Sequence, residues 1–197
     1  NVLRFYDAKT AIVFCATRAT VNRMTSRFNN RGFSVVALSG ELSQTQRTQA
    51  LQSIRDGRAR VCIATDVAAR GLDLPNLELV IHADLPKNRE SLLHRSGRTG
   101  RAGRKGSSVL IVPNNARKRT ERLFQSAKID TTWANPPTVH EISKRDDERI
   151  LLDPILTSPL TDAEHSFAEH LIKSHSAEQI AGAFVRIYRA GQSAPEE

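Results

Sequence analysis

Five short apolar runs alternate with amphipathic stretches between residues 11 and 112, and this alternation constrains the fold more than any other feature. The runs are Ala11–Cys15, Phe33–Leu38, Val61–Ala64, Leu79–His82 and Val109–Val112. Each is too short for a helix and apolar at nearly every position, as strands buried on both faces are. The stretches between them have helical periodicity, so the pattern predicts an α/β fold with a doubly wound parallel sheet.

Two of the connecting stretches carry the signals of helix ends. Ala19–Asn30 and Ser43–Arg55 place apolar residues at three- and four-residue intervals, and Ser43 can cap the second helix. Gly32 and Gly57 stand just before the next strands, where helix-ending glycines are common. Open sheets of this class bind ligands at the carboxyl ends of their strands. A binding site is therefore expected among the residues that follow the apolar runs.

The charge is divided unevenly along the chain. Residues 1–130 carry 23 basic and 10 acidic side chains, or +13, whereas residues 131–197 carry 6 and 11, or −5. The basic surplus is typical of a nucleic-acid or polyphosphate binder, although a solvated basic face without a ligand would give the same count. Residues 1–130 and residues 131–197 are therefore expected to bind different partners.

Several protein classes are excluded by composition. The sequence has no apolar stretch long enough for a membrane span and no secretory signal at its start. Its two cysteines, Cys15 and Cys62, lie inside predicted buried strands, which excludes a disulfide framework and a Cys-rich zinc site. We therefore expect a cytoplasmic protein without a membrane or metal site of its own.

The densest group of functional residues is the segment His94–Lys105. Four arginines and a lysine alternate there with Gly97, Gly100 and Gly103, which predicts that a helix ends inside the segment. Guanidinium groups on such a turn can hold phosphate oxygens in a bidentate way. The alternative is a solvated basic loop.

A second group, Ala64–Asp73, begins where the third strand ends. Thr65 can donate a hydrogen bond to a phosphate, and Asp73 can accept one from a ribose hydroxyl. The alternative is local: Asp66 caps a short helix and Asp73 pairs with Arg70. The two groups together favour the nucleotide interpretation.

Residues 11 to 112 resemble the second, C-terminal RecA-like domain of DEAD-box RNA helicases. Four segments are similar, in order, to the family's motif IV, QxxR motif, motif V and motif VI: Ala11–Thr17, Gln44–Arg47, Ala64–Asp73 and His94–Arg101. The last segment begins with His-Arg, whereas the same motif in RecQ-like DNA helicases typically begins with Gln. This difference favours RNA over DNA as the nucleic acid bound. The resemblance covers about half of the chain and implies a RecA-like fold.

The resemblance implies a role at ATP for six residues. Arg98 and Arg101 match the arginine fingers that reach the γ-phosphate, where such residues accelerate hydrolysis about 10³- to 10⁵-fold. The other four are Gly71, Asp73, His94 and Arg95. Of these, Asp73 is expected to contact the ribose. The sequence has no phosphate loop and no Asp-Glu-Ala-Asp segment, so ATP with Mg²⁺ is expected to bind mainly to a missing N-terminal RecA-like domain.

The resemblance also implies a path for RNA. Thr17, Arg47 and Thr65 match residues that hold the sugar-phosphate backbone, and the loop at Gly40 lies close by. Contacts with the backbone make binding independent of base sequence and sensitive to salt.

The remainder, residues 131–197, is predicted to be a helical extension of the RecA-like domain formed by residues 1–130. Thr161 and Ser176 have capping-box spacing before two amphipathic helices. Such a hairpin can dock on the first domain or form a homodimer. Trp133 and Tyr188 can stack on RNA bases, although packing in a core is the favoured interpretation.

Two hypotheses of different classes follow. In the first, the chain is part of an ATP-dependent RNA helicase that separates short duplexes, is joined to its N-terminal domain in one polypeptide, and is inactive alone. In the second, it is a stand-alone, non-catalytic module for RNA binding or dimerisation. Because Asn1 stands where an initiating Met would, we expect a fragment.

Overall fold

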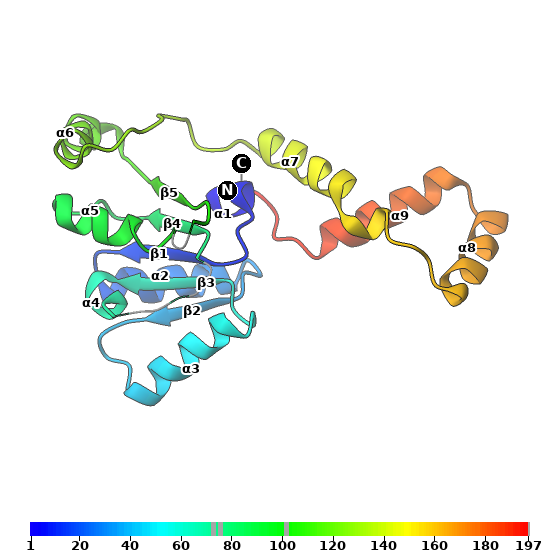
Figure 1. Ribbon diagram of the computed structural model, residues 1–197, viewed down its shortest axis with the longest axis horizontal. Helices are drawn as coiled ribbons and strands as arrows, with labels where there is room; N and C mark the ends of the chain where they lie inside the picture. Colours follow the sequence, from blue (N-terminus) through cyan, green and yellow to red (C-terminus); the bar gives the residue numbers. More distant parts are fainter. Residues whose placement is uncertain (72–73, 75–76, 101–102, 197) are drawn as a thin grey trace. The chain divides into compact units, whose positions relative to one another are not determined.

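The computed structural model describes residues 1–71, 74, 77–100 and 103–196 (Figure 1). The chain forms two compact units. One is Tyr6–Asn135, and the other combines Asn1–Phe5 with Pro136–Glu197. The functional division that we expect between residues 130 and 131 stays a prediction.

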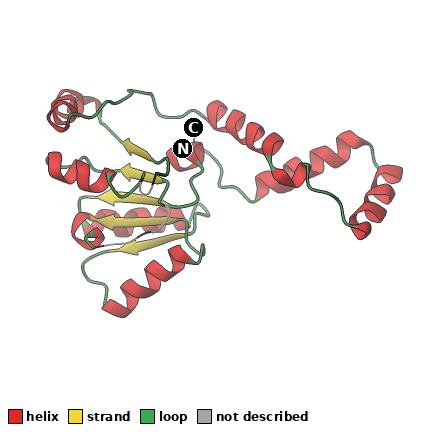
Figure 2. Cartoon of the chain, in the orientation of Figure 1, coloured by secondary structure: helices red, strands yellow, loops and turns green. Residues whose placement is uncertain are grey.

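The first unit is built on a parallel sheet, as the apolar runs predict. Its strands are β1 (Ala11–Cys15), β2 (Val35–Leu38), β3 (Val61–Thr65), β4 (Leu79–His82) and β5 (Ser107–Leu110). They are parallel and lie in the order β2-β3-β1-β4-β5, with helices around them (Figures 1 and 2). Every residue of β1, β3 and β4 is buried, so these strands are covered on both faces.

Strand β5 begins two residues earlier than the predicted run Val109–Val112. Ser107 pairs with Leu79 and Ser108 with Val80, so the serines belong to the ladder although they are polar. An edge strand is bonded on one side only and is less buried, so it tolerates polar residues that hide it from an apolar pattern.

The helices of this unit are α2 (Arg18–Asn29), α3 (Gln44–Arg55), α4 (Asp66–Ala69), α5 (Arg89–Ser96) and α6 (Arg117–Ala127), with a 3₁₀ turn at Asn114–Ala116. Ser43 caps α3 through a capping box with Gln46. Gly32 and Gly57 follow α2 and α3 with φ of 78° and 72°, the left-handed backbone that favours glycine. The helix-end predictions are thus confirmed.

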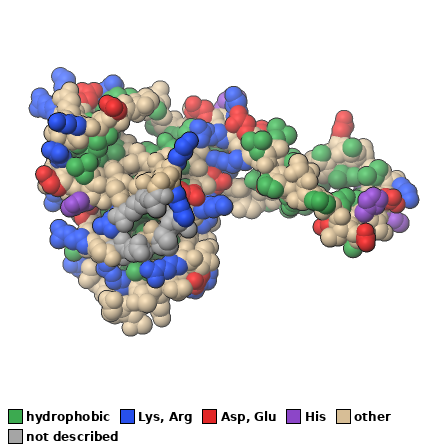
Figure 3. All heavy atoms as spheres, in the orientation of Figure 1, with side chains coloured by type: hydrophobic (Ala, Val, Ile, Leu, Met, Phe, Trp, Pro, Cys, Tyr) green, Lys and Arg blue, Asp and Glu red, His purple; other side chains and the backbone are tan. Residues whose placement is uncertain are grey.

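The second unit is helical. It holds α7 (Val139–Leu152), a 3₁₀ turn at Pro154–Leu156, α8 (Asp162–Ser174) and α9 (Ala177–Ala190), and most of α1 (Val2–Tyr6). The capping boxes predicted at Thr161 and Ser176 are present. Apolar side chains stay exposed on the α8–α9 hairpin (Figure 3). On these two helices, Phe167, Ile172 and Ile187 are 66%, 67% and 74% exposed.

A buried ion pair joins α1 to α7 inside this unit. Arg4 is 6% exposed, and its Nη2 donates to Asp146 Oδ2 at 2.6 Å. Arg149 donates to the other carboxylate oxygen at 2.7 Å, and Gln192 accepts from Arg4 Nη1. A buried guanidinium without its carboxylate would be strongly destabilising, so this pair ties the N-terminal segment to the C-terminal helices.

We expect Asp146→Ala to lower the free energy of unfolding by about 3 kcal/mol, because it leaves the Arg4 charge buried and unpaired. The double variant Arg4→Met with Asp146→Leu removes both charges and should recover most of that loss. Chemical denaturation followed by the helical signal measures both. The exposed pair Arg189–Asp147 is the control, since Arg189→Ala should cost less than about 1 kcal/mol. Equal losses in the single and double variants would contradict the assignment.

Candidate functional site

The residues predicted to hold RNA gather along one edge of the sheet. Cys15 of β1 pairs with Thr65 of β3, and Leu38 of β2 pairs with Ala64 of β3, so the three strands end at the same level. Thr17 follows β1, Gly40 follows β2, and Thr65 ends β3. The structure therefore places these three residues on one carboxyl edge, where parallel sheets bind ligands.

The two threonines each begin a helix. Thr17 Oγ1 accepts a hydrogen bond from the Thr20 N–H at 3.1 Å, and Thr65 Oγ1 accepts one from the Ala68 N–H at 3.4 Å. A hydroxyl that accepts as a cap still has its own proton to donate. Thr17 is exposed and Thr65 is buried, so the Thr17 hydroxyl is the more accessible donor for a phosphate oxygen.

Arg47 connects α3 to the loop after α4. Its Nη2 donates to the Arg70 carbonyl at 2.9 Å, and the side chain is half-buried. A guanidinium has five N–H donors, so one bond does not exhaust it. Gly71 follows with φ of 68°, which turns the chain sharply after Arg70. Arg47 and Gly71 thus lie at the same loop.

Arg95 in α5 is 3% exposed and donates three hydrogen bonds. Its Nε and Nη2 donate to the two carboxylate oxygens of Asp66 at 2.6 and 2.7 Å, and its Nη1 donates to the Asp84 carbonyl at 2.7 Å. The guanidinium carbon lies 5.1 Å from the centroid of the Phe14 ring. Bidentate pairing and a ring face satisfy a cation that would otherwise be costly to bury. These contacts fix α5 against the ends of β1, β3 and β4.

The arginine-rich segment leaves α5 in a turn, as its glycines predict. The helix ends at Ser96 with Gly97 as its C-cap, and Arg98 lies in the turn beyond it. His94 is exposed on α5. Asp73 and Arg101 lie outside the described residues. The nucleotide roles that the resemblance implies for these residues, and for Arg95 and Gly71, stay predictions.

A close backbone approach shapes this turn. A Cβ on Gly106 would lie 2.0 Å from Thr99 Oγ1 and 2.6 Å from the Gly100 nitrogen. Gly106 therefore allows the chain entering β5 to pass against the segment that carries Arg98. No local sequence pattern predicts this contact, because it depends on the fold and not on local spacing.

His82 of β4 contacts the end of α5 from the buried side. It is fully buried in β4, and its Nε2 lies 3.1 Å from Ser108 Oγ and 3.4 Å from Ser96 Oγ. Burial lowers the pKa of His82 to about 3, and the Arg95 charge adds to the effect. A neutral imidazole thus links β4, β5 and α5.

Sequence reasoning missed the roles of two carboxylates. Asp66 pairs with Arg95, whereas the local alternative made it a helix cap; the cap of α4 is Thr65. Asp84 accepts the Ala16 N–H through Oδ2 at 2.7 Å, in addition to its carbonyl bond with Arg95. Its position just after the apolar run of β4 was the available signal.

The cysteines are structural. Burial raises the pKa of Cys15 to about 11 and that of Cys62 to about 12, so both thiols are protonated at neutral pH.

Within the described ranges, no helix is long and apolar enough to cross a membrane. In the same ranges, no three His, Cys, Asp or Glu side chains are grouped to hold a metal ion.

Comparison with known proteins decides the family. Residues 2–103, more than half of the chain, match the family model "Helicase conserved C-terminal domain". The chain belongs to this family. Its fold, a parallel sheet flanked by helices, is the RecA-like fold of DEAD-box C-terminal domains, so the predicted resemblance and fold class are confirmed.

Two relatives of this helicase domain are named as ATP-dependent RNA helicases. It is 50% identical over 114 residues to DEAD-box ATP-dependent RNA helicase 53 of Oryza sativa, covering 58% of this chain and 19% of that protein. It is 38% identical over 147 residues to ATP-dependent RNA helicase DeaD of Buchnera aphidicola, covering 73% and 24%. The chain thus spans no more than a quarter of the length of these two relatives.

A solved structure shows the same fold. Dbp5 of S. cerevisiae bound to RNA and ADP BeF3 superposes with a TM-score of 0.63 and 27% identity, over 79% of this helicase domain chain and 41% of the Dbp5 chain.

We expect His82 to stay neutral in the folded domain from about pH 7 down to about pH 4. The unfolded chain binds this proton near pH 6.5, its ordinary value, and the folded chain only near pH 3. Stability should therefore fall as the pH drops through this window, by up to about 1.4 kcal/mol per pH unit from His82 alone. Imidazole NMR signals followed during an acid titration test this, and a His82 midpoint near its ordinary value would contradict it.

Proposed function

We propose that this chain is the second RecA-like domain of an ATP-dependent RNA helicase and that it acts together with an N-terminal RecA-like domain of the same polypeptide. The observation that carries the proposal is the Arg95–Asp66 pair. It holds α5, the helix that ends just before Arg98, beside the strand ends that carry Thr17 and Thr65. One surface then faces both ATP and RNA.

On the nucleotide side, the domain contributes cations. Arg98 and Arg101 would donate to the γ-phosphate and stabilise the charge that develops during transfer to water. Gly71, Asp73 and His94 would complete this face, with Asp73 at the ribose. The ATP site would be completed by the other domain, which would also bind Mg²⁺, because this sequence has no phosphate loop and no Asp-Glu-Ala-Asp segment. Closure of the two domains would assemble the site, and this chain alone would not hydrolyse ATP.

On the RNA side, the domain contributes hydrogen-bond donors to the backbone. The Thr17 and Thr65 hydroxyls, the Arg47 guanidinium and the loop at Gly40 line the carboxyl edge. Such contacts read phosphates and sugars and not bases. The helicase would hold one strand in a strained path and so separate short duplexes locally, in the cytoplasm.

A second candidate function is a dimerisation or RNA-binding module without catalysis. The observation that favours it is the exposed apolar surface of the α8–α9 hairpin, where Phe167 and Ile187 are largely exposed. Apolar surface of this kind is typical of an interface. A homodimer through these helices is compatible with the helicase function, and the molar mass in solution at tens of micromolar decides whether it forms.

We expect Arg98→Ala to reduce RNA-stimulated ATP hydrolysis by the full-length protein about 10³-fold or more, and to leave RNA affinity nearly unchanged. The matched control is Arg104→Ala, which removes an exposed arginine from the same segment beyond the family motif. Steady-state ATPase rates and RNA affinities, measured for both variants, check this. A rate for Arg98→Ala equal to that of the parent would show that Arg98 is not a finger.

Arg47→Ala should weaken RNA binding and reduce the slope of log affinity against log salt by about 0.7, the value for one phosphate contact on single-stranded RNA. Arg58→Ala is the control. Arg58 is exposed, pairs with Asp56 and lies before β3, at the opposite edge of the sheet. Fluorescence anisotropy over a series of salt concentrations measures both slopes. Equal slopes for Arg47→Ala and the parent would remove Arg47 from the RNA path.

A further inference from the structure

Helix α6 carries charges that the strand-end site does not use. Four of its eleven residues are basic and one is acidic, and the basic ones are all exposed. They are Arg117, Lys118, Arg119 and Arg122. Three of them stand in the first turn, where the helix dipole disfavours positive charge. A polyanion bound beside this helix would offset that unfavourable placement.

The chain reverses at the end of α6 and brings an aromatic ring back over the helix. Lys128 adopts φ of 53°, its N–H donates to the Gln125 carbonyl, and the Ile129 N–H donates to the Phe124 carbonyl at 3.2 Å. This hydrogen-bond pattern is typical of an α-helix that ends in a residue with a left-handed backbone conformation. It returns Trp133 to a helix that ended six residues before it.

Trp133 is held there by two contacts and stays partly open to solvent. The Arg117 guanidinium lies over the indole, 4.7 Å from the ring centroid, and the Phe124 ring meets it edge-on at 6.1 Å. The residue is nevertheless 40% exposed. The prediction of core packing is therefore wrong for Trp133. An indole that is already fixed in place and accessible to solvent offers a surface for base stacking. A base can stack on it with little further loss of side-chain conformational entropy.

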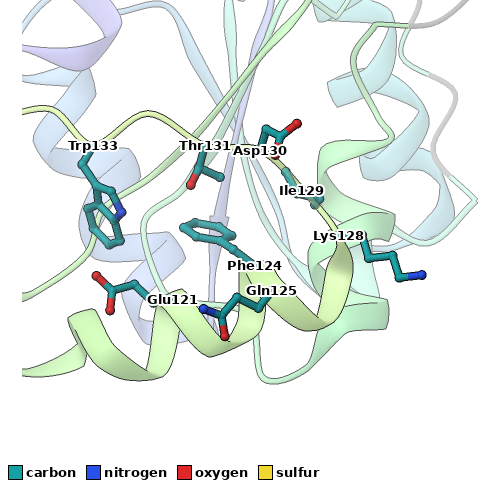
Figure 4. A pocket seen from close by; sticks show the side chains of 8 residues that line it. All are labelled: Glu121, Phe124, Gln125, Lys128, Ile129, Asp130, Thr131 and Trp133. Carbon is teal, nitrogen blue, oxygen red and sulfur yellow. The ribbon is translucent and has the colours of Figure 1, made fainter.

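A pocket of about 370 Å³ opens between this ring and α6. Its lining combines two aromatic rings with polar side chains: Glu121, Phe124, Gln125, Lys128, Ile129, Asp130, Thr131 and Trp133. Arg117 is not part of the lining, although its guanidinium contacts two residues that are, Trp133 and Glu121. In Figure 4 the Phe124 ring lies between Trp133 and Lys128, and Lys128 points away from both rings. The volume is in the range of small-ligand sites.

The polar groups of the pocket suit a base better than a phosphate. Glu121 and Asp130 bring carboxylates, which repel phosphate but accept hydrogen bonds from the amino groups of bases. Glu121 Oε1 already accepts a hydrogen bond from Arg117 Nε at 3.2 Å, which leaves its other oxygen for a base. Gln125 adds an amide that both donates and accepts. Phosphates would instead meet cations at the rim. On a helical wheel of about 3.6 residues per turn, Lys118 lies about 20° and Arg122 about 60° from Gln125, on the same side, whereas Arg119 lies about 120° away.

From these observations we infer that the pocket between Trp133 and α6 binds an unpaired nucleotide of RNA. The base stacks on Trp133 against Phe124, and the neighbouring phosphates lie along Lys118 and Arg122. The site is separate from the strand-end edge that holds the backbone under the proposed function. The test therefore uses readouts that distinguish a failure here from a failure there.

The single tryptophan of the chain makes the first test direct, since its fluorescence reports on this pocket alone. Oligoadenylate of about ten nucleotides, within the usual site size for single strands, should quench the full chain in a saturable way. An abasic ribose-phosphate strand of the same length should bind more weakly and leave the fluorescence unchanged. Bound oligoadenylate without quenching, or equal quenching by the abasic strand, overturns the inference. Equal quenching by adenosine monophosphate at the same concentration overturns the assignment to RNA in favour of a free nucleotide.

Variants provide a second, independent test by anisotropy of labelled oligoadenylate. Trp133→Ala should weaken binding about tenfold, and Trp133→Phe, which keeps a ring, should recover much of that loss. Lys118→Gln with Arg122→Gln should reduce the salt slope by about 1.4. Arg119 is an exposed cation on the same helix, and Arg119→Gln should leave the affinity within about twofold of the parent.

Parental affinity in Trp133→Ala, or equal effects of Arg119→Gln and Arg122→Gln, contradicts the inference. Arg47→Ala should retain the fluorescence quenching at saturation even if its affinity falls.

Discussion

A buried arginine holds the functional edge of this domain together. Burying a guanidinium is costly unless its donors are satisfied, and Arg95 meets that condition through a bidentate bond to Asp66, the Asp84 carbonyl and the face of Phe14. Its partners come from the ends of three strands, so one side chain sets where α5 lies. Lysine could not replace it, since an ammonium has neither the planar fork nor the ring contact.

The position of α5 then determines what the edge presents. Arg98 leaves the end of this helix, while Thr17 and Thr65 begin helices at the neighbouring strand ends. Neutral His82 supports the same helix end from the core. The proposed nucleotide and RNA surfaces therefore share one rigid support, which is the physical basis for coupling ATP to RNA in the proposed function. The basic helix α6 extends the positive surface of this unit beyond that edge.

The sequence predicts well what depends on local spacing and poorly what depends on long-range contact. Buried strands, the Ser43 cap and a helix end inside the segment His94–Lys105 follow from patterns within a few residues of each other, and the structure has all of them. The partner of Arg95 lies 29 residues away, and the core-packing interpretation of Trp133 failed because the reversal at Lys128 depends on a backbone angle that no local pattern marks. At the site, the sequence predicts which residues share the edge but not that Asp66 is the partner of Arg95.

The most direct test of the account is a map of where RNA binds. Backbone amide NMR signals of the full chain, followed as unpaired RNA is added, report each residue separately. The account predicts shifts at Thr17, Gly40 and Thr65, on the carboxyl edge, and none at Gly32 and Gly57, which precede β2 and β3 at the other edge. Shifts confined to Gly32 and Gly57, with the carboxyl edge unchanged, would contradict it.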